Sequence, residues 1–322
     1  MDQVTVPSRV PGSAGAVLRA LGGPLRILTP VVILVVLAQR LGAGPFEAAF
    51  AATSPALLAA AVAVTAVTTA CNAWRWRIVA AGLDLHIPLS TAVAACYRSQ
   101  LLNAALPLGV LGDLQRGVGH GLSQGHAGRG LRAVVCERTA GQGVQLVVTA
   151  AVLLLLPSPV HPLVGLAAGG AGLVLGAAVL VGGRGARGRR RGGTAHGATG
   201  LTGGGLVRVV AASFAATWGH VVVFLLAVRA ASVDLPAVEM VPLALVVLLA
   251  AAVPVNLAGW GPREGVAAWV FSSVGLTAAQ GVEVSVVYGL MALVATLPGL
   301  AVVAGGRVRR STSGNRLGRV HG

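Results

Sequence analysis

The sequence predicts an all-α integral membrane protein with about six membrane-spanning helices and two shorter broken-helix hairpins, which simple hydropathy would count as about eight spans. Hydrophobic residues make up 55% of the 322 residues and charged residues only 10%, and the mean hydropathy is +0.82. Soluble domains carry roughly 25% charged residues. The apolar residues come in runs of about 20, the length that a helix needs to cross the hydrocarbon.

The net charge of +15 comes from arginine alone, because the chain contains no lysine. The arginines lie between apolar runs and not along one amphipathic face, so the charge indicates cytoplasmic loops rather than nucleic-acid binding. Cys71, Cys96 and Cys136 lie in or beside apolar runs, without the spacing of a metal site or a disulfide framework. We therefore expect no metal, no cofactor and no nucleic-acid partner.

The first elements are a polar tail at residues 1–23 and a span at about 24–41. No small-x-small cleavage site follows this span, which favours a retained helix over a signal peptide. The next span, about 55–79, carries polar residues at helical spacing, which either bond to neighbouring helices or line a cavity. These residues are Thr65, Thr68, Thr69, Asn72 and Trp76. Arg75 and Arg77 are expected to mark the cytoplasmic end of the span.

The segment 88–128 is predicted to hold a helix that starts at Pro88 and breaks at Pro107, followed by the sequence GDLQRG. A span at about 131–156 follows, and its polar residues recur every four positions, so they should face the bundle interior. Another span is expected at 160–182.

A Gly/Arg-rich loop at 183–207 separates the two halves of the chain. We expect this loop to be solvated and to lie beside anionic lipid headgroups. The alternative is that it binds a phosphate or RNA. Spans at 207–230 and 237–253 follow, then a break at 254–262, a helix at 263–275 and a last span at 281–304. A basic tail, 305–322, ends the chain.

Arginine positions suggest how these segments cross the membrane. Most of the 24 arginines fall on the cytoplasmic side if 88–128 and 237–276 are re-entrant hairpins, each returning to its own side. The membrane domain, 24–304, then consists of two pseudo-repeats, 24–156 and 160–304, in an inverted arrangement typical of transporters. We expect a multi-pass plasma-membrane protein with both termini in the cytoplasm.

A set of charged residues is predicted near the membrane midplane. A single charge at that depth costs about 2.5–3.5 kcal/mol, so these residues must pair or meet water. The arginines are Arg98, Arg116, Arg138 and Arg263, and the acids are Asp113, Glu137 and Glu264. One positive charge is left over, and the planar guanidinium suits a phosphate.

The sequence leaves two interpretations of this set open. The arginines, with Asn103, bind substrate while the acids pair with them or bind protons, or the whole set forms buried ion pairs that fix helix register. Asp113 is alternatively the cap of a half-helix. Proline and glycine breaks are predicted to shape the site. They are Pro107, Gly109, Gly112, Pro254, Gly259 and Gly261.

At these residues the chain resembles the transmembrane region of the lysylphosphatidylglycerol synthase family, which is the flippase domain of the multiple peptide resistance factor and its stand-alone relatives. The matching motifs are R-x4-N-x3-P…GD-x2-R at 98–116, E-R at 137–138 and P-x4-G-x-G-x-R-E at 254–264. The surrounding spans extend the resemblance over about 20–305. The chain departs from the commoner GGD pattern at Leu111, and Trp260 separates the second pair of glycines.

The resemblance implies movement of a lipid between leaflets. In the fused proteins the lipid is aminoacylated phosphatidylglycerol, and relatives are associated with polyprenyl-linked sugar pathways. Lysyl transfer is not implied, because the fused proteins carry it on a soluble domain that this sequence does not contain.

We therefore expect a lipid flippase or translocase, not an enzyme, whose partners are membrane lipids. The alternatives are a membrane enzyme with Glu137 or Asp113 as general acid or base, and a non-catalytic partner of an envelope glycosyltransferase or lipid synthase. The sequence contains no P-loop, GxSxG or HExxH motif.

Overall fold

The computed structural model describes residues 42–106, 109–156, 203–253 and 260–304, with scattered positions at 35–39 and 160–173. The described chain is helical, which confirms the predicted fold class. The helices are α2 (Gly44–Ala52), α3 (Pro55–Ala81), α4 (Leu89–Ala105), α5 (Leu111–Ser123), α6 (Ala127–Leu155), α8 (Gly203–Ala230), α9 (Ala237–Ala251), α10 (Pro262–Ser272) and α11 (Ala278–Thr296). The predicted span 24–41 and most of the predicted span 160–182 and loop 183–207 lie outside the described residues.

Four helices, α3, α6, α8 and α11 with its extension to Ala304, are long and apolar enough to cross a membrane. They correspond to the spans predicted at 55–79, 131–156, 207–230 and 281–304. Two of them begin at side-chain caps, because Ser54 accepts a hydrogen bond from Leu57 N and Thr277 forms a capping box with Gln280. The short helix α2, between the first two predicted spans, was not predicted.

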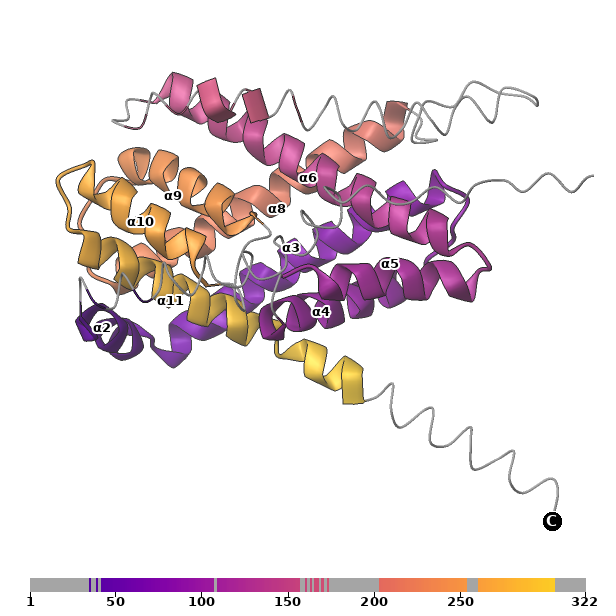
Figure 1. The fold of residues 1–322 in the computed structure, drawn as a ribbon, viewed down its shortest axis with the longest axis horizontal. Coiled ribbons are helices and arrows are strands. Elements are labelled where there is room, and N and C mark those ends of the chain that lie inside the picture. The colour runs from indigo at the N-terminus through magenta and orange to yellow at the C-terminus, as the bar shows by residue number, and fades with distance from the viewer. Residues whose placement is uncertain are drawn as a thin grey trace, which may run out of the picture.

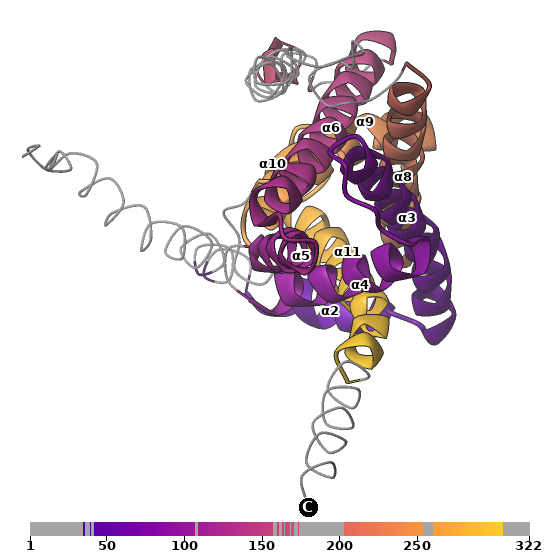
Figure 2. The same ribbon diagram turned by 90° about the vertical axis from the view of Figure 1, so that its right-hand side faces the viewer.

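Two pairs of shorter helices alternate with the long ones. At 1.5 Å per residue, the 17 residues of α4 extend over about 26 Å, and α5, α9 and α10 are shorter still, against a hydrocarbon thickness of about 30 Å. In chain order α4 and α5 lie between α3 and α6, and α9 and α10 lie between α8 and α11. The two pairs occupy opposite ends of the longest axis, and α4 and α5 lie in front of α9 and α10 after a quarter turn (Figures 1 and 2).

The backbone explains why each pair turns where it does. Gly109, before α5, has φ of 60°, and Gly261, before α10, has φ of 124°; glycine adopts such values without steric cost. Pro262 then occupies the first turn of α10, where its missing N–H costs nothing. The predicted breaks at Pro107, Pro254 and Gly259 lie outside the described residues.

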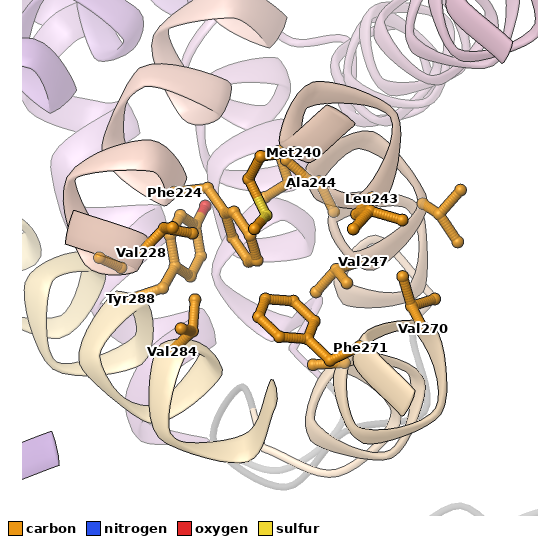
Figure 3. Packing of buried hydrophobic residues seen from close by; sticks show 14 of the residues in the cluster. Phe224, Val228, Met240, Leu243, Ala244, Val247, Val270, Phe271, Val284 and Tyr288 are labelled. Carbon is orange, nitrogen blue, oxygen red and sulfur yellow. The ribbon is translucent and has the colours of Figure 1, made fainter. Parts of the chain in front are cut away.

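The apolar core forms two clusters, and the larger one extends from the second half to buried residues of α2, α3 and α6. The larger cluster joins α8, α9, α10 and α11 around Phe224, Met240, Phe271 and Tyr288 (Figure 3). A smaller cluster joins α3, α4 and α6 around Trp76. The pair α9 and α10 is therefore held mainly by apolar packing, whereas α4 and α5 lie beside a network of polar side chains.

Candidate functional site

Glu137 of α6 lies buried between two arginines from other helices. Arg75 of α3 donates from Nε to Glu137 Oε1 at 3.0 Å and also from Nη2, and Arg116 of α5 donates to Oε2 at 2.9 Å. Arg75 Nη1 reaches Ser213 Oγ of α8 at 3.0 Å. The carboxylate thus links α3, α5 and α6, and Arg75 extends the link to α8.

Asp113, in the first turn of α5, is the second acidic node. Its Oδ1 accepts from Ser99 Oγ at 2.7 Å and forms an ion pair with Arg116 Nη2 at 3.2 Å. Its Oδ2 accepts from Asn103 Nδ2 at 2.9 Å and from Arg138 Nη2. Asp113 therefore has three hydrogen-bond donors, of which two are neutral, and a further ion pair with Arg116.

Asn103 uses both ends of its carboxamide to hold the start of α5. While Nδ2 donates to Asp113, Oδ1 accepts from Gly112 N at 2.8 Å. This bond satisfies one of the backbone N–H groups that a helix start leaves without a partner. Asp113 itself forms no capping bond, although a negative charge in the first turn is favourable to the helix dipole.

The side chain of Arg116 is only 4% exposed, and both of its terminal nitrogens are engaged. Its guanidinium carbon lies 4.5 Å from the centre of the Trp76 ring, and Nη1 lies 2.9 Å from Cys96 Sγ. Together with the two carboxylates, these contacts occupy both terminal nitrogens of Arg116, whereas its Nε has no hydrogen-bond partner among the described residues and its side chain borders a cavity that Arg138 also lines.

Arg138 differs from the other two arginines of this network, because 49% of its side chain is exposed. It borders two cavities, one of about 310 Å³ beside α4, α5 and α11 and one of about 240 Å³ between α6 and α8. The two cavities also share further lining residues: Asn72, Arg75, His220 and Tyr288. Arg138 therefore presents a guanidinium where the two cavities adjoin.

Arg263 and Glu264 form a separate, self-contained pair at the start of α10. Glu264 Oε1 accepts from Arg263 Nη2 at 2.6 Å and from Ser285 Oγ at 3.2 Å, and its Oε2 accepts from Gly261 N at 2.7 Å. Arg263 is 5% exposed and lines neither of the two cavities. Its removal therefore tests the packing of α10 rather than contact with a substrate.

The pair reaches the cavities only through an aromatic neighbour. The Arg263 guanidinium lies 5.2 Å from the centre of the Tyr288 ring. The Tyr288 hydroxyl lies 3.3 Å from His220 Nδ1, and both Tyr288 and His220 line the cavities.

The structure brings together most of the residues predicted for the site. Asn103, Arg116, Arg138, Asp113 and Glu137 form one network, Gly109 lines the larger cavity, and Arg263 and Glu264 lie apart. Arg98 is half-buried on α4 and forms no hydrogen bond or ion pair within the described part of the chain. Whether the predicted residues bind substrate remains a prediction.

Arg75 was missed, because the sequence analysis assigned it to the cytoplasmic end of its span. The structure buries it instead, with 7% exposure. A signal was present, since Arg75 lies three residues after Asn72 and so on the polar stripe of the same helix. The polar stripe of α3 both lines a cavity and bonds to a neighbouring helix. Asn72 and Thr65 line the larger cavity, and Thr69 forms a hydrogen bond with Gln100 of α4 at 3.2 Å.

The sequence predicted a charged set with one positive charge in excess. The observed network has the same excess, but it is made by a different set of residues. Three arginines, Arg75, Arg116 and Arg138, meet two acids, Asp113 and Glu137, which leaves one positive charge.

The family model described as "Lysylphosphatidylglycerol synthase TM region" matches residues 20–299 of the chain. The chain belongs to this family. The matched range contains both charged groups and both pairs of short helices, so the resemblance predicted from the three motifs is confirmed. No curated protein and no solved structure matches the chain. Membership of the lysylphosphatidylglycerol synthase TM region family, with four helices able to cross a membrane, makes this a multi-pass membrane protein related to lipid modification or flipping.

Proposed function

We propose that the protein moves a phosphate-bearing lipid between the two leaflets and that Arg138 contacts the phosphate. The observation that carries this proposal is the half-exposed guanidinium of Arg138 at the junction of two cavities. A guanidinium binds phosphate through two parallel hydrogen bonds. The unbalanced positive charge of the network matches the single negative charge of a phosphodiester.

Arg138 can exchange partners at low cost. When it leaves Asp113, that carboxylate keeps Ser99 and Asn103 as hydrogen-bond donors and Arg116 as an ion-pair partner. Arg75 and Arg116, by contrast, hold the buried Glu137, and loss of either would leave a poorly compensated charge. Because both carboxylates are held by arginines, the proposal gives them an orienting role and not a catalytic one.

The test compares Arg138→Gln with Arg77→Gln in proteoliposomes. Arg77 lies exposed on α3 and has no ion pair in the described part of the chain. Arg77→Gln is therefore a control that also removes one arginine but leaves the network intact. We expect Arg138→Gln to slow the leaflet exchange of fluorescent phosphatidylglycerol by about tenfold or more, since a charge-assisted hydrogen bond is worth about 1.5–3 kcal/mol. Dithionite quenching of the outer-leaflet label measures the exchange.

Arg138→Lys should recover part of the rate, because lysine keeps the charge but lacks the planar fork. A native rate in Arg138→Gln would overturn the proposal. Exchange should remain native in Arg77→Gln.

The arrangement of the two pairs of short helices supports an alternating-access mechanism with inverted repeats. The pairs lie at opposite ends of the longest axis (Figure 1). Residues where α4 ends and α5 begins, such as Asn103 and Gly109, line the larger cavity, and Leu248 and Ala251 of α9 line the smaller one. In this proposal each pair is re-entrant and reaches the lipid phosphate from its own side of the membrane.

Charge at the helix ends supports the orientation. Arg75, Glu137 and Ser213 join the last part of α3 to the first halves of α6 and α8, so the end of α3 and the starts of α6 and α8 lie on the same side. The charges at these ends are mostly basic. The opposite ends carry mostly acids. The basic end has Arg77, Arg129, Arg132 and Arg208 with one acid, Asp84, and the acidic end has Glu47, Asp234, Glu239 and Glu283 with one arginine, Arg229. By the positive-inside rule the basic end faces the cytoplasm.

Single cysteines test this topology. In a background without Cys71, Cys96 and Cys136, we expect Ser123→Cys, at the end of α5, to react with an impermeant maleimide only from the cytoplasmic side. Ser273→Cys, directly after α10, should react only from outside, and both positions are exposed. Labelling of Ser123→Cys from outside alone would show that the first pair of short helices is not re-entrant.

A further inference from the structure

The smaller cavity is lined by two polar stripes with the same spacing on neighbouring helices. Each stripe occupies positions i, i+4 and i+7, which lie on one face of a helix. The residues are Arg138, Gln142 and Gln145 on α6, and Ser213, Thr217 and His220 on α8. Asn72 of α3 completes the polar part of the wall, and Leu248 and Ala251 of α9 are apolar.

The carboxamides in this wall are free to bind a ligand. Within the described residues, the side chains of Asn72, Gln142 and Gln145 form no hydrogen bond. A carboxamide offers two donors and an acceptor oxygen, and a ligand hydroxyl also both donates and accepts. The Ser213 and Thr217 hydroxyls donate to carbonyls of their own helix at 2.7 and 3.0 Å. This leaves the Thr217 oxygen as an acceptor, whereas Ser213 Oγ already accepts from Arg75.

The same wall offers a cation no carboxylate. None of the residues that line the smaller cavity is acidic, whereas Arg75 and Arg138 both line it. The nearest carboxylates, Asp113 and Glu137, border the adjoining cavity, and each contacts two arginines.

The aromatic ring in the wall is already engaged by a cation. The Arg263 guanidinium lies 5.2 Å from the centre of the Tyr288 ring, within the distance at which a cation binds an aromatic face. An ammonium in the cavity would therefore meet two arginines and an occupied ring.

We propose that the transported lipid carries an uncharged, hydroxyl-rich headgroup, such as a glycerol, inositol or sugar, which binds between the α6 and α8 stripes while Arg138 holds the phosphate. This inference rests on the proposed function. The volume of about 240 Å³ lies just below the range of roughly 300–1,000 Å³ for drug-sized ligands, so the cavity takes a headgroup and not the acyl chains.

The experiment measures leaflet exchange of a panel of lipids that carry the same fluorescent acyl chain, in phosphatidylcholine proteoliposomes containing the full-length protein. The panel is phosphatidylglycerol, phosphatidylinositol, phosphatidic acid, phosphatidylethanolamine and lysyl-phosphatidylglycerol. We expect the glycerol and inositol lipids to exchange about tenfold faster than the two lipids that carry an ammonium group, because an ammonium meets two arginines and no carboxylate in this cavity.

The outcomes separate the two proposals. Exchange of phosphatidylethanolamine or lysyl-phosphatidylglycerol at the rate of phosphatidylglycerol would overturn the headgroup assignment and leave the translocase function standing. If no lipid of the panel exchanged faster than in protein-free vesicles, the proposed function itself would fail, and the assignment with it.

A variant of the wall provides a second readout. Gln142→Leu removes a carboxamide from the α6 stripe, so the ratio of phosphatidylglycerol to phosphatidic acid exchange should fall by about tenfold, since phosphatidic acid has a phosphate but no polyol. Val147→Leu is the control on the same helix, because Val147 is 50% exposed and outside the cavity lining. An unchanged ratio in Gln142→Leu would contradict the assignment.

Discussion

Replacing Glu137 with glutamine is expected to destabilise the protein by about 3–5 kcal/mol, the usual cost of breaking a buried ion pair. Glu137 is 2% exposed, and it is the ion-pair partner of Arg75, while Arg116 relies on it and on Asp113. The substitution keeps the shape of the side chain and removes its charge, so two buried guanidinium groups lose their main compensation. Thermal unfolding of the detergent-purified protein measures the effect.

Glu283→Gln is the matched control, because Glu283 is partly exposed on α11 and has no ion pair within the described residues. We expect its unfolding temperature to stay close to that of the native protein. The double variant with Arg75→Gln should be less unstable than the sum of the two single variants, as is usual for residues in direct contact. Native stability in Glu137→Gln would show that the network contributes little to the fold.

Gly112→Ala is expected to disrupt the packing of α4 against α5. A Cβ atom at Gly112 would overlap the carbonyl oxygen of Ser99 and lie 2.8 Å from its carbonyl carbon. Because the obstacle is backbone, α5 must move, and overpacking of this kind costs about 1–3 kcal/mol. The movement would also displace Asp113 from Ser99 Oγ, so both the unfolding temperature and lipid exchange should fall.

Gly119→Ala is the control on the same helix, since a Cβ atom at Gly119 would meet nothing within 4 Å. Alanine favours a helix over glycine by about 1 kcal/mol, so this variant should be as stable as the native protein or slightly more so. If Gly112→Ala behaved like Gly119→Ala, the close contact between α4 and α5 would be refuted.

The helices could be predicted from the sequence because their signals are local. Apolar runs of about 20 residues predicted the four long helices. The breaks before Leu111 and Pro262 predicted where each pair of short helices turns. The contacts of the site could not be predicted in this way, since Arg75 and Glu137 are 62 positions apart in the sequence. Arg75 resembles an anchor at a span end, yet α3 continues to Ala81 and carries it nearly two turns inside the helix.

Arg98 illustrates the converse problem. It lies in the motif beside residues that do reach the network, but consecutive residues of a helix point about 100° apart. Ser99 and Asn103, four positions apart, share the face of α4 that bonds to Asp113, and Arg98 does not lie on that face. Spacing within the motif predicted which segment carries the site, and only the packing of α4 on α5 decides which side chains take part.

The single hydrogen bond between Arg75 and Ser213 has a consequence for motion. Within the described residues, it is the one side-chain hydrogen bond between the half that ends at α6 and the half that begins at α8, and every ion pair remains within one half. Sliding of α8 along α3 would break one charge-assisted bond, at a cost of about 1.5–3 kcal/mol. Such sliding would leave every ion pair of the charged network intact, and the rearrangement would fall on the apolar packing of α3 against α8.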